Sequence, residues 1–488
     1  MTMKTKTTNR FLACVLAVSL CACAEGSELT DTANHDWLDL VRLYTSADSL
    51  NDAEDSYRWH KLVQGSSARR DSFLAEWWQA FGDDTLTQLI TQAFESNRDL
   101  RTARAKVLEA RARLGVSAAD LRPKAAGNAQ YTQGRNSDIE DMRSYNKYEL
   151  GIDTSWELDF LGKNKHALDS AKANLESEHA ALNSAWVSLS AEVAMNYINL
   201  RIFQHRLESL RHNAEIQSEI LALLESQYNA GLKDSSAVQQ ERYTLETTRA
   251  EIPQVEQSIQ KTMNALAVLT GEIPGSLNEK LSEVKAIPKA EDSRLIGIPA
   301  ETIRQRPDIL EAERRLAAQT SARKSAQKEL YPSVSLIGSI GLESLSSGNL
   351  FSSGAYGFTI GPKITWPIFD GGAIRKNIQE QFAVEEQLAA ELEGVILHAV
   401  GEVRNALSAN AQEIERNARL RAGLRAASEA LEIARNRYER GIAGFGELLS
   451  AQKALSDAES ECIASDGQKV INLVMLFKSL GGGWLNME

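Results

Sequence analysis

The chain contains no long apolar segment beyond its start, and acidic residues outnumber basic ones. After residue 23, no stretch reaches the ~20 consecutive apolar residues that a membrane-spanning helix requires. Such a chain can cross a membrane only with strands, because every backbone polar group in lipid must be paired within the protein. The net charge of −12 opposes contact with phosphate backbones, so we expect no nucleic-acid partner.

Motifs for catalysis and metal binding are also lacking. The seven histidines include no His-Glu-x-x-His sequence, and no cysteine pair has the spacing of metal ligands. The run Gly481-Gly482-Gly483 lies near the C-terminus, where it indicates the end of a helix and not a phosphate-binding loop. We therefore expect a protein that is not an enzyme, with no metal site and no cofactor other than a covalent lipid.

The N-terminal residues indicate export and lipid attachment. Three basic residues precede an apolar run from Phe11 to Leu20, which is too short to span a bilayer as a helix. The following Leu20-Cys21-Ala22-Cys23 resembles a bacterial lipoprotein signal, which predicts removal of residues 1–22 and lipidation of Cys23. An ordinary cleaved signal with an incidental cysteine is the alternative. Loss of the signal would change the net charge from −12 to −15.

Cysteine is too scarce for a disulfide framework. Cys14 and Cys21 would leave with the signal and Cys23 would carry the lipid, so Cys462 remains alone. Cys462 lies in a helical pattern and is expected to be a small, packed apolar residue. Ala24, in place of Asp, favours sorting of the lipoprotein to the outer membrane.

The chain is duplicated with a spacing of about 210 residues. The sequence Tyr228-Asn-Ala-Gly231-Leu232 recurs as Tyr438-Glu-Arg-Gly441-Ile442. Further matches in the same order are Trp156 with Trp366, Gly162 with Gly372, Val238 with Leu448, Leu245 with Leu455 and Pro123 with Pro332. A repeat of this length predicts two halves of common architecture, and in a membrane-directed chain such pseudo-symmetry suggests a pore.

Each repeat contains a pair of candidate strands, at about residues 124–134 and 147–158 and at about 332–343 and 356–367. Apolar side chains alternate with polar ones at Tyr148, Leu150, Ile152 and Trp156, and again at Phe358, Ile360 and Trp366. A period of two places these residues on one face of a sheet, which we expect to be the outward, lipid-facing side of a membrane barrel. A half-buried soluble sheet has the same alternation, and the export signal favours the barrel.

Long helices follow the strands. No Gly or Pro occurs between Gly162 and Gly231, and leucines recur every seven residues at Leu168, Leu175, Leu182 and Leu189. A sustained heptad period predicts supercoiled helices, here roughly 100 Å long. The second copy contains Gly394, Gly401 and Gly423, so we expect it to be less regular or locally bent.

The glycines at the far ends predict sharp turns. Gly231 and Gly441 can adopt the left-handed conformation that reverses the chain, and returning helices are expected from about 235 to 269 and from about 445 to 480. The predicted organisation is a signal peptide (1–22), a lipidated tether (23–72), a first repeat (73–270), a connector (271–299), a second repeat (300–482) and a tail (483–488).

Four strands cannot close a membrane barrel, since the smallest bacterial barrels have about eight. Open strand edges are not tolerated in lipid, so copies of the chain must associate. Two copies would give an interior filled by side chains, whereas three would give about twelve strands and an open lumen. A homotrimer is therefore the simplest pore.

Several motifs together resemble those of the TolC-like outer-membrane efflux proteins, in particular the NodT-type lipoproteins that serve resistance-nodulation-division pumps. They are Trp77-Trp78 with Phe81-Gly82-Asp83, Arg306-Pro307-Asp308-Ile309, Leu330-Tyr331-Pro332, the run Trp366 to Gly372, and Tyr438 to Gly441 followed by Glu447 to Gln452. The resemblance covers about residues 73 to 484. Residues 24–122 contain no Pro, whereas the family's lipoproteins usually have a Pro-rich stretch after the lipid cysteine.

The resemblance implies a mixed fold, a trimeric twelve-stranded β-barrel that continues into a long periplasmic α-helical barrel, built from duplicated helix–hairpin–helix repeats. Such proteins are passive exit channels in the Gram-negative outer membrane, in contact with its lipid. They open when a periplasmic membrane-fusion adaptor and an inner-membrane pump dock. A same-fold exit for an ATP-driven type I secretion system and a non-conducting periplasmic coiled-coil lipoprotein are the alternatives.

The resemblance also implies roles for residues near the helix turns. Glu447 would form a ring of three carboxylates at the periplasmic constriction, and the alternative is a carboxylate that stabilises a helix N-terminus. Asp234 would add a second charge or act as an N-cap. Tyr228 and Tyr438 would hold neighbouring helices together by hydrogen bonds or pack at helix ends. The tips expected to contact the adaptor are Gly231, Leu232, Lys233, Gly441, Ile442 and Ala443.

Overall fold

The computed structural model describes residues 75–135, 144–232, 234–289 and 300–484, all of which lie within one unit, Arg58–Glu488. The predicted signal peptide, the tether with Cys23, Lys233 and the end of the connector lie outside the described residues. Among the described residues, no helix is both long enough and apolar enough to span a membrane.

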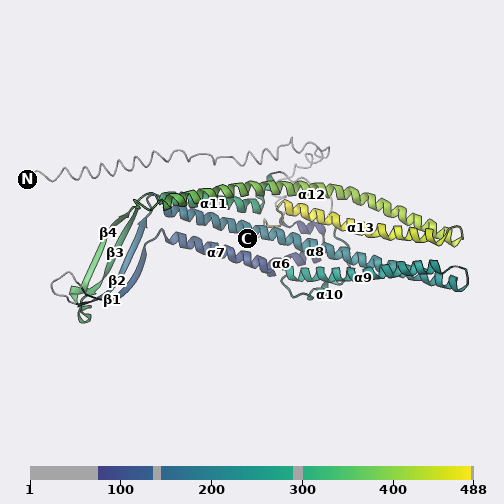
Figure 1. The fold of residues 1–488 in the computed structure, drawn as a ribbon, viewed down its shortest axis with the longest axis horizontal. Coiled ribbons are helices and arrows are strands. Elements are labelled where there is room, and N and C mark those ends of the chain that lie inside the picture. The colour runs from purple at the N-terminus through teal and green to yellow at the C-terminus, as the bar shows by residue number, and fades with distance from the viewer. Residues whose placement is uncertain (1–74, 136–143, 233, 290–299, 485–488) are drawn as a thin grey trace, which may run out of the picture. The chain divides into compact units, whose positions relative to one another are not determined.

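The duplication is visible in the order and length of the elements (Figure 1). The first repeat consists of α7 (Arg98–Ala119), β1 (Lys124–Arg135), β2 (Ser144–Leu158), α8 (Lys163–Asn229) and α9 (Ser235–Leu269). The second consists of α11 (Pro307–Lys328), β3 (Ser333–Ser344), β4 (Tyr356–Thr365), α12 (Ala373–Glu439) and α13 (Phe445–Ser479). Corresponding helices have equal lengths, with 22, 67 and 35 residues in each repeat.

Shorter elements precede each repeat or lie within it. A 3-10 helix, η1 (Trp77–Phe81), and α6 (Asp84–Ser96) lead into α7. The connector contains α10 (Asn278–Leu281), and η3 (Ala300–Gln305) leads into α11. The loop between β3 and β4 contains η4 (Ser347–Asn349) and η5 (Ser353–Ala355).

The glycines of the second long helix do not interrupt it, and α12 is one continuous helix from Ala373 to Glu439. A Cβ atom placed at Gly394, Gly401 or Gly423 would meet nothing within 4 Å, so these glycines mark no close approach within the chain. Hydrogen bonding along the helix therefore outweighs the roughly 1 kcal/mol that each helical glycine costs.

The helical pattern that follows Phe81 predicts one helix through Asn97 to about Ala118, and this prediction is wrong. Asn97 separates α6 from α7 with an extended ψ of 136°, and its Oδ1 accepts a hydrogen bond from the backbone N–H of Leu100. Its Nδ2 donates to the carbonyl of Leu269 at the end of α9. Arg306 repeats this arrangement before α11, with Nη1 donating to the carbonyl of Ser479 at the end of α13. One polar residue in each repeat therefore joins the entering helix to the returning helix.

The four strands form one antiparallel sheet in the order β1-β2-β3-β4. The register places Ile152 opposite both Gly127 and Ile340, and Ile340 opposite Phe358. Directly opposed residues project from the same face. The sheet therefore has one apolar face and one face that carries mostly polar residues, as the alternation predicts.

The core of the helical part includes the Trp77-Trp78 segment. Trp77 is completely buried and its ring stacks on Phe477 of α13, with ring centroids 5.4 Å apart. Trp78 packs edge-on against Phe94, which packs in the same way against Trp186 of α8. This cluster fixes η1 and α6 against the middle of α8 and the end of α13.

Candidate functional site

The two hairpin turns are built alike. Gly231 and Gly441 both have φ +71°, and a Cβ atom placed at either would meet nothing within 4 Å. The N–H of Gly231 donates to the carbonyl of Tyr228, and that of Gly441 donates to the carbonyl of Tyr438, both at 2.9 Å. The left-handed conformation and these bonds end each long helix and reverse the chain, as predicted from the glycines.

An apolar layer beneath the turns joins the two hairpins. Leu224 of α8 and Val238 of α9 form a buried cluster with Phe445 and Leu448 of α13. Tyr438 packs against this layer, with its ring edge-on to Phe445 and the centroids 6.1 Å apart. The residues at the very tips stay exposed, with Leu232 at 74% and Ile442 at 66%. The tip cluster, meaning these four buried residues, thus joins α8, α9 and α13 under an exposed surface, and Tyr438 of α12 packs against it.

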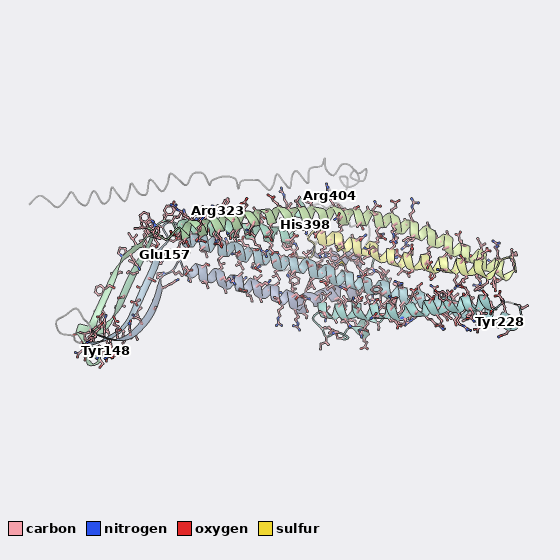
Figure 2. All side chains as sticks on the ribbon, viewed as in Figure 1. Tyr148, Glu157, Tyr228, Arg323, His398 and Arg404 are labelled. Carbon is pink, nitrogen blue, oxygen red and sulfur yellow. The ribbon has the colours of Figure 1, made fainter. Side chains whose placement is uncertain are left out.

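The two predicted tyrosines differ in their contacts. Tyr438 donates from its hydroxyl to Oε1 of Gln227 at 3.3 Å, which links α12 to α8 as proposed from the sequence. Tyr228 lies at the end of α8 (Figure 2) and is 48% exposed. Within the described part of the chain, its hydroxyl has no hydrogen-bond partner. A role in joining helices of one chain is therefore supported for Tyr438 alone.

Asp234 is the N-cap of α9. Its Oδ1 accepts hydrogen bonds from the backbone N–H groups of Ser236 at 3.0 Å and Ala237 at 3.3 Å. The structure thus supports the capping role that the sequence left as the alternative. The cap uses one carboxylate oxygen, and it holds the negative charge at the positive end of the helix dipole.

Glu447 lies in the first turn of α13, where its carboxylate forms an ion pair with Arg437 at the end of α12. The distance between Nη1 and Oε1 is 2.9 Å, and both side chains are about half exposed. Sequence reasoning did not single out Arg437. In the first repeat the corresponding residues are Gln227 and Ala237, so this ion pair belongs to the second hairpin only. In this chain the carboxylate of the candidate ring residue Glu447 is thus paired with a positive charge.

The strand residues named from the sequence share the apolar face. Leu150, Ile152, Phe358 and Ile360 are exposed in the single chain. Tyr148 is half-buried against Tyr131, with ring centroids 5.0 Å apart. The predicted strand through Trp366 ends earlier, at Thr365. Pro367 explains this end, since proline has no N–H to continue a strand ladder.

Two tryptophans secure the junction between sheet and helices in the same way. Nε1 of Trp156 donates to the carbonyl of Leu121 at 3.0 Å, and Nε1 of Trp366 donates to the carbonyl of Leu330 at 3.1 Å. Each bond ties the end of a strand pair to the turn before that pair. Glu157, labelled at this junction in Figure 2, pairs with Lys163 at the start of α8. Two equivalent tryptophan hydrogen bonds, one in each repeat, thus hold the sheet at the ends of the helices.

The connector is held on α8 by a buried polar network that sequence reasoning missed. Arg201 is completely buried, and its Nη1 donates to Gln204 and to the carbonyl of Glu283, each at 2.7 Å. The hydroxyl of Tyr197 donates to Oδ2 of Asp83 at 2.7 Å. Burial, together with this bond, raises the pKa of Tyr197 to about 12. The network was missed because a polar residue in a heptad pattern gives no sign of which helix face the connector covers.

Comparisons with known proteins agree with this architecture. The family model for outer membrane efflux proteins matches residues 89–272 and 298–482. Outer membrane protein OprJ of Pseudomonas aeruginosa is 32% identical over 421 residues, which cover 83% of this chain and 86% of OprJ. The probable outer membrane lipoprotein SilC of Salmonella typhimurium is 29% identical over 420 residues, covering 84% of this chain and 88% of SilC.

The structure of the outer-membrane channel OprN superposes with a TM-score of 0.81 at 34% identity, covering 84% of this chain and 93% of that one. The two matched ranges span most of the chain and coincide with its two structural repeats. The chain therefore belongs to the outer membrane efflux protein family. It is an exit channel of an efflux system in the outer membrane of a Gram-negative bacterium.

Proposed function

We propose that three copies of the chain close a twelve-stranded barrel in the outer membrane and continue as an α-helical barrel into the periplasm. The conduit passively carries small molecules from a periplasmic adaptor and an inner-membrane pump to the exterior. At 1.5 Å per residue, the 67 residues of α8 correspond to roughly 100 Å between the sheet and the tips. Such a length suits a duct that reaches well beyond the membrane.

The observation that carries this proposal is the register of the sheet. Apolar residues of all four strands align on one face, and the other face carries mostly polar side chains. Within the described residues, β1 and β4 each pair on one side only. A lipid-exposed strand must have both edges paired, so β4 of one copy would pair with β1 of the next. The polar face would then line the lumen, and the apolar face would contact lipid.

The polar face also supports conduction of hydrated solutes. Nζ of Lys147 lies 2.7 Å from Oε1 of Glu149 and 3.0 Å from Oε1 of Glu343. Glu149 and Glu343 are directly opposed on neighbouring strands, so Lys147 offsets the repulsion between their like charges. A cluster of this kind remains hydrated in an aqueous lumen, whereas in lipid it would be expensive.

The hairpin tips are the proposed periplasmic entrance. The tip cluster and the bond from Tyr438 to Gln227 keep the hairpins of one chain together in the closed state. The exposed Gly231, Leu232, Gly441 and Ile442, with the half-buried Ala443, form the surface for the adaptor. Docking of the adaptor would separate the hairpins and widen the entrance.

The lipid on Cys23 would anchor the chain to the outer membrane in addition to the barrel. Its proposed role rests on the sequence Leu20-Cys21-Ala22-Cys23 and on the relation to a probable outer membrane lipoprotein. Cys23→Ser is expected to lose radiolabelled palmitate and to retain the barrel.

The test is the oligomeric mass of the purified full-length chain together with its conductance in planar lipid bilayers. The proposal predicts a trimer by light scattering in detergent and a discrete, stepwise current after insertion. Gly341→Trp, in which a large side chain would enter a strand contact already crowded by the carbonyl of Leu150, should abolish both. A monomer that never conducts under any salt or voltage would refute the barrel.

A further inference from the structure

One carboxyl group is buried beneath the hairpin tips without a partner. Glu241 of α9 has 0% exposure, and neither of its carboxyl oxygens has a hydrogen-bond partner among the described residues. A buried carboxylate is normally paired or hydrogen-bonded, because an isolated charge in an apolar layer is very costly. The side chain of Glu241 therefore fits this buried position when its carboxyl group is protonated and neutral.

The position of Glu241 places it in the seam that closes the first hairpin. Val238, one turn earlier, belongs to the tip cluster, and Leu245, one turn later, is buried as well. Spacings of three and four residues put these side chains on one face of the helix. That face packs against α8, the main helical neighbour of α9. The carboxyl thus occupies a core position between two apolar residues.

Two buried amides beside the tip cluster also lack partners within the described part of the chain. Oε1 of Gln217 on α8 and Nε2 of Gln452 on α13 have no hydrogen bond. Gln217 lies two turns before Leu224, and Gln452 lies one turn after Leu448. Both therefore border the tip cluster on the side away from the turns. Incompletely satisfied polar groups next to an apolar layer make this seam a weak point of the closed hairpins.

The charged residues at this level lie outside the seam. They are Glu219 and Glu225 on α8, Arg242 on α9, Glu432 and Arg435 on α12, and Lys453 on α13. Arg242 is occupied by Glu225, with Nη2 and Oε1 2.8 Å apart. Burial is the sole cause of the altered pKa of Glu241, so none of these charges offsets the cost of ionising it.

The titration of Glu241 depends on whether the seam is closed. Burial raises its pKa from 4.5 to about 7. Separation of α9 from α8 would admit water and return the pKa towards 4.5. Between these two values the closed form binds more protons than the separated form, so its relative stability falls as the pH rises through this window. The ratio of separated to closed forms would rise by at most about tenfold per pH unit for each carboxyl.

We propose that Glu241 is a proton-dependent latch of the hairpin tips. The neutral acid allows α9 to pack on α8 and closes the seam, and loss of the proton favours separation of the hairpins. This inference rests on the proposed gating by hairpin separation. It makes the entrance easier to open in neutral than in acidic surroundings, at a position distinct from the exposed ion pair at the tip.

The experiment compares the full-length chain with Glu241→Gln, which keeps the size of the side chain and cannot ionise. Conductance in planar bilayers is measured from pH 4.5 to pH 8. The wild type is expected to conduct several-fold more at pH 8 than at pH 5, and Glu241→Gln should lose most of this difference. Glu246→Gln is the matched control, because Glu246 is an exposed residue of the same helix, paired with Arg249.

A second readout does not depend on conduction. Hydrogen exchange of the amides in residues 218–248, corrected for the intrinsic effect of pH, should show protection that falls with pH in the wild type and not in Glu241→Gln. Equal pH dependence in both chains would overturn the latch, even if the channel conducts. Absence of current in every variant would refute the proposed function, and the exchange data would then still decide the role of Glu241.

Discussion

Arg437 and Glu447 lie 2.9 Å apart across the turn of the second hairpin, joining the last turn of α12 to the first turn of α13. Both side chains are about half exposed, so the pair contributes little to stability, about 0–1 kcal/mol. Its main consequence is electrostatic. Each chain brings one positive and one negative charge of this pair to the proposed entrance, so the two charges sum to near zero.

Removal of the charge of Arg437 and removal of the charge of Glu447 should shift the ion selectivity of the channel in opposite directions. Arg437→Gln leaves Glu447 unpaired and is expected to increase preference for cations, whereas Glu447→Gln leaves Arg437 and should favour anions. The double variant should resemble the wild type. The measurement is the reversal potential in a KCl gradient.

Arg419→Gln is the control for this series, because Arg419 is an exposed residue of the same helix, about 27 Å from Arg437. That distance exceeds the Debye length of about 8 Å at physiological salt, so its selectivity should not change. Equal reversal potentials in all of these variants would mean that the tip does not form the narrowest charged part of the duct.

The hydroxyl of Tyr438 should help to keep the entrance closed. Tyr438→Phe removes the bond to Gln227 and retains the packing of the ring against Phe445. A loss of about 1 kcal/mol from the closed state corresponds to roughly fivefold more opening. Single-channel recording measures this ratio.

Tyr243→Phe is the comparison for Tyr438→Phe, since Tyr243 is an exposed tyrosine near the start of α9. It should leave opening unchanged. If Tyr438→Phe opens no more often than Tyr243→Phe, the bond to Gln227 plays no part in closure.

Two glycines with nearly the same backbone conformation should respond differently to substitution. Gly231 has φ +71° and Gly271 has φ +73°, so alanine at either costs about 1–2 kcal/mol from the left-handed conformation. At Gly271 the new Cβ atom would also lie 2.3 Å from the carbonyl oxygen of Ser96, a backbone atom that cannot rotate away.

Gly271→Ala is therefore expected to unfold at least 5 °C below Gly231→Ala, or to fail to accumulate, as judged by circular dichroism in detergent. Equal melting temperatures would show that α6 and the end of α9 can separate without cost.

Asp83 should stabilise the start of α6. Its Oδ1 accepts hydrogen bonds from the N–H groups of Thr85 at 2.8 Å and Leu86 at 3.0 Å, and its Oδ2 accepts from Tyr197. Asp83→Ala should lower the free energy of unfolding by about 2 kcal/mol, through loss of the cap and of a buried bond. Asp84→Ala, which changes an exposed neighbour, should cost less than half as much in the same urea titration. A smaller loss at Asp83 than at Asp84 would contradict the capping role.

The repeating parts of the fold follow from sequence patterns because each pattern has a local cause. The leucines that recur every seven residues predict long helices, because such positions, Leu189 among them, return to the same helix face every two turns. On that face they pack against a neighbouring helix. Gly231 and Gly441 predict the turns because the left-handed conformation is easiest for glycine. The alternation of apolar and polar residues around Ile152 and Ile360 predicts the two faces of the sheet, because successive side chains of a strand point to opposite faces.

The contacts that give the site its chemistry depend on helices that meet only after folding. Glu241 follows Gln239 and Gln240, so a local reading of this polar run would place it at the surface. It is buried because its turn of α9 lies on the face that packs against α8. Arg437 and Glu447 belong to different helices, and their approach depends on the angle set by Gly441.

The single-sided pairing of β1 and β4, described for the sheet, has a genetic consequence. In the proposed trimer, every chain completes its sheet with two neighbours, and one faulty edge would spoil the whole ring. A cell that makes normal and faulty chains in equal amounts would form only about one fully normal trimer in eight. Mutations at these two edges should therefore be dominant over a normal gene copy, whereas mutations that prevent folding before assembly should be recessive.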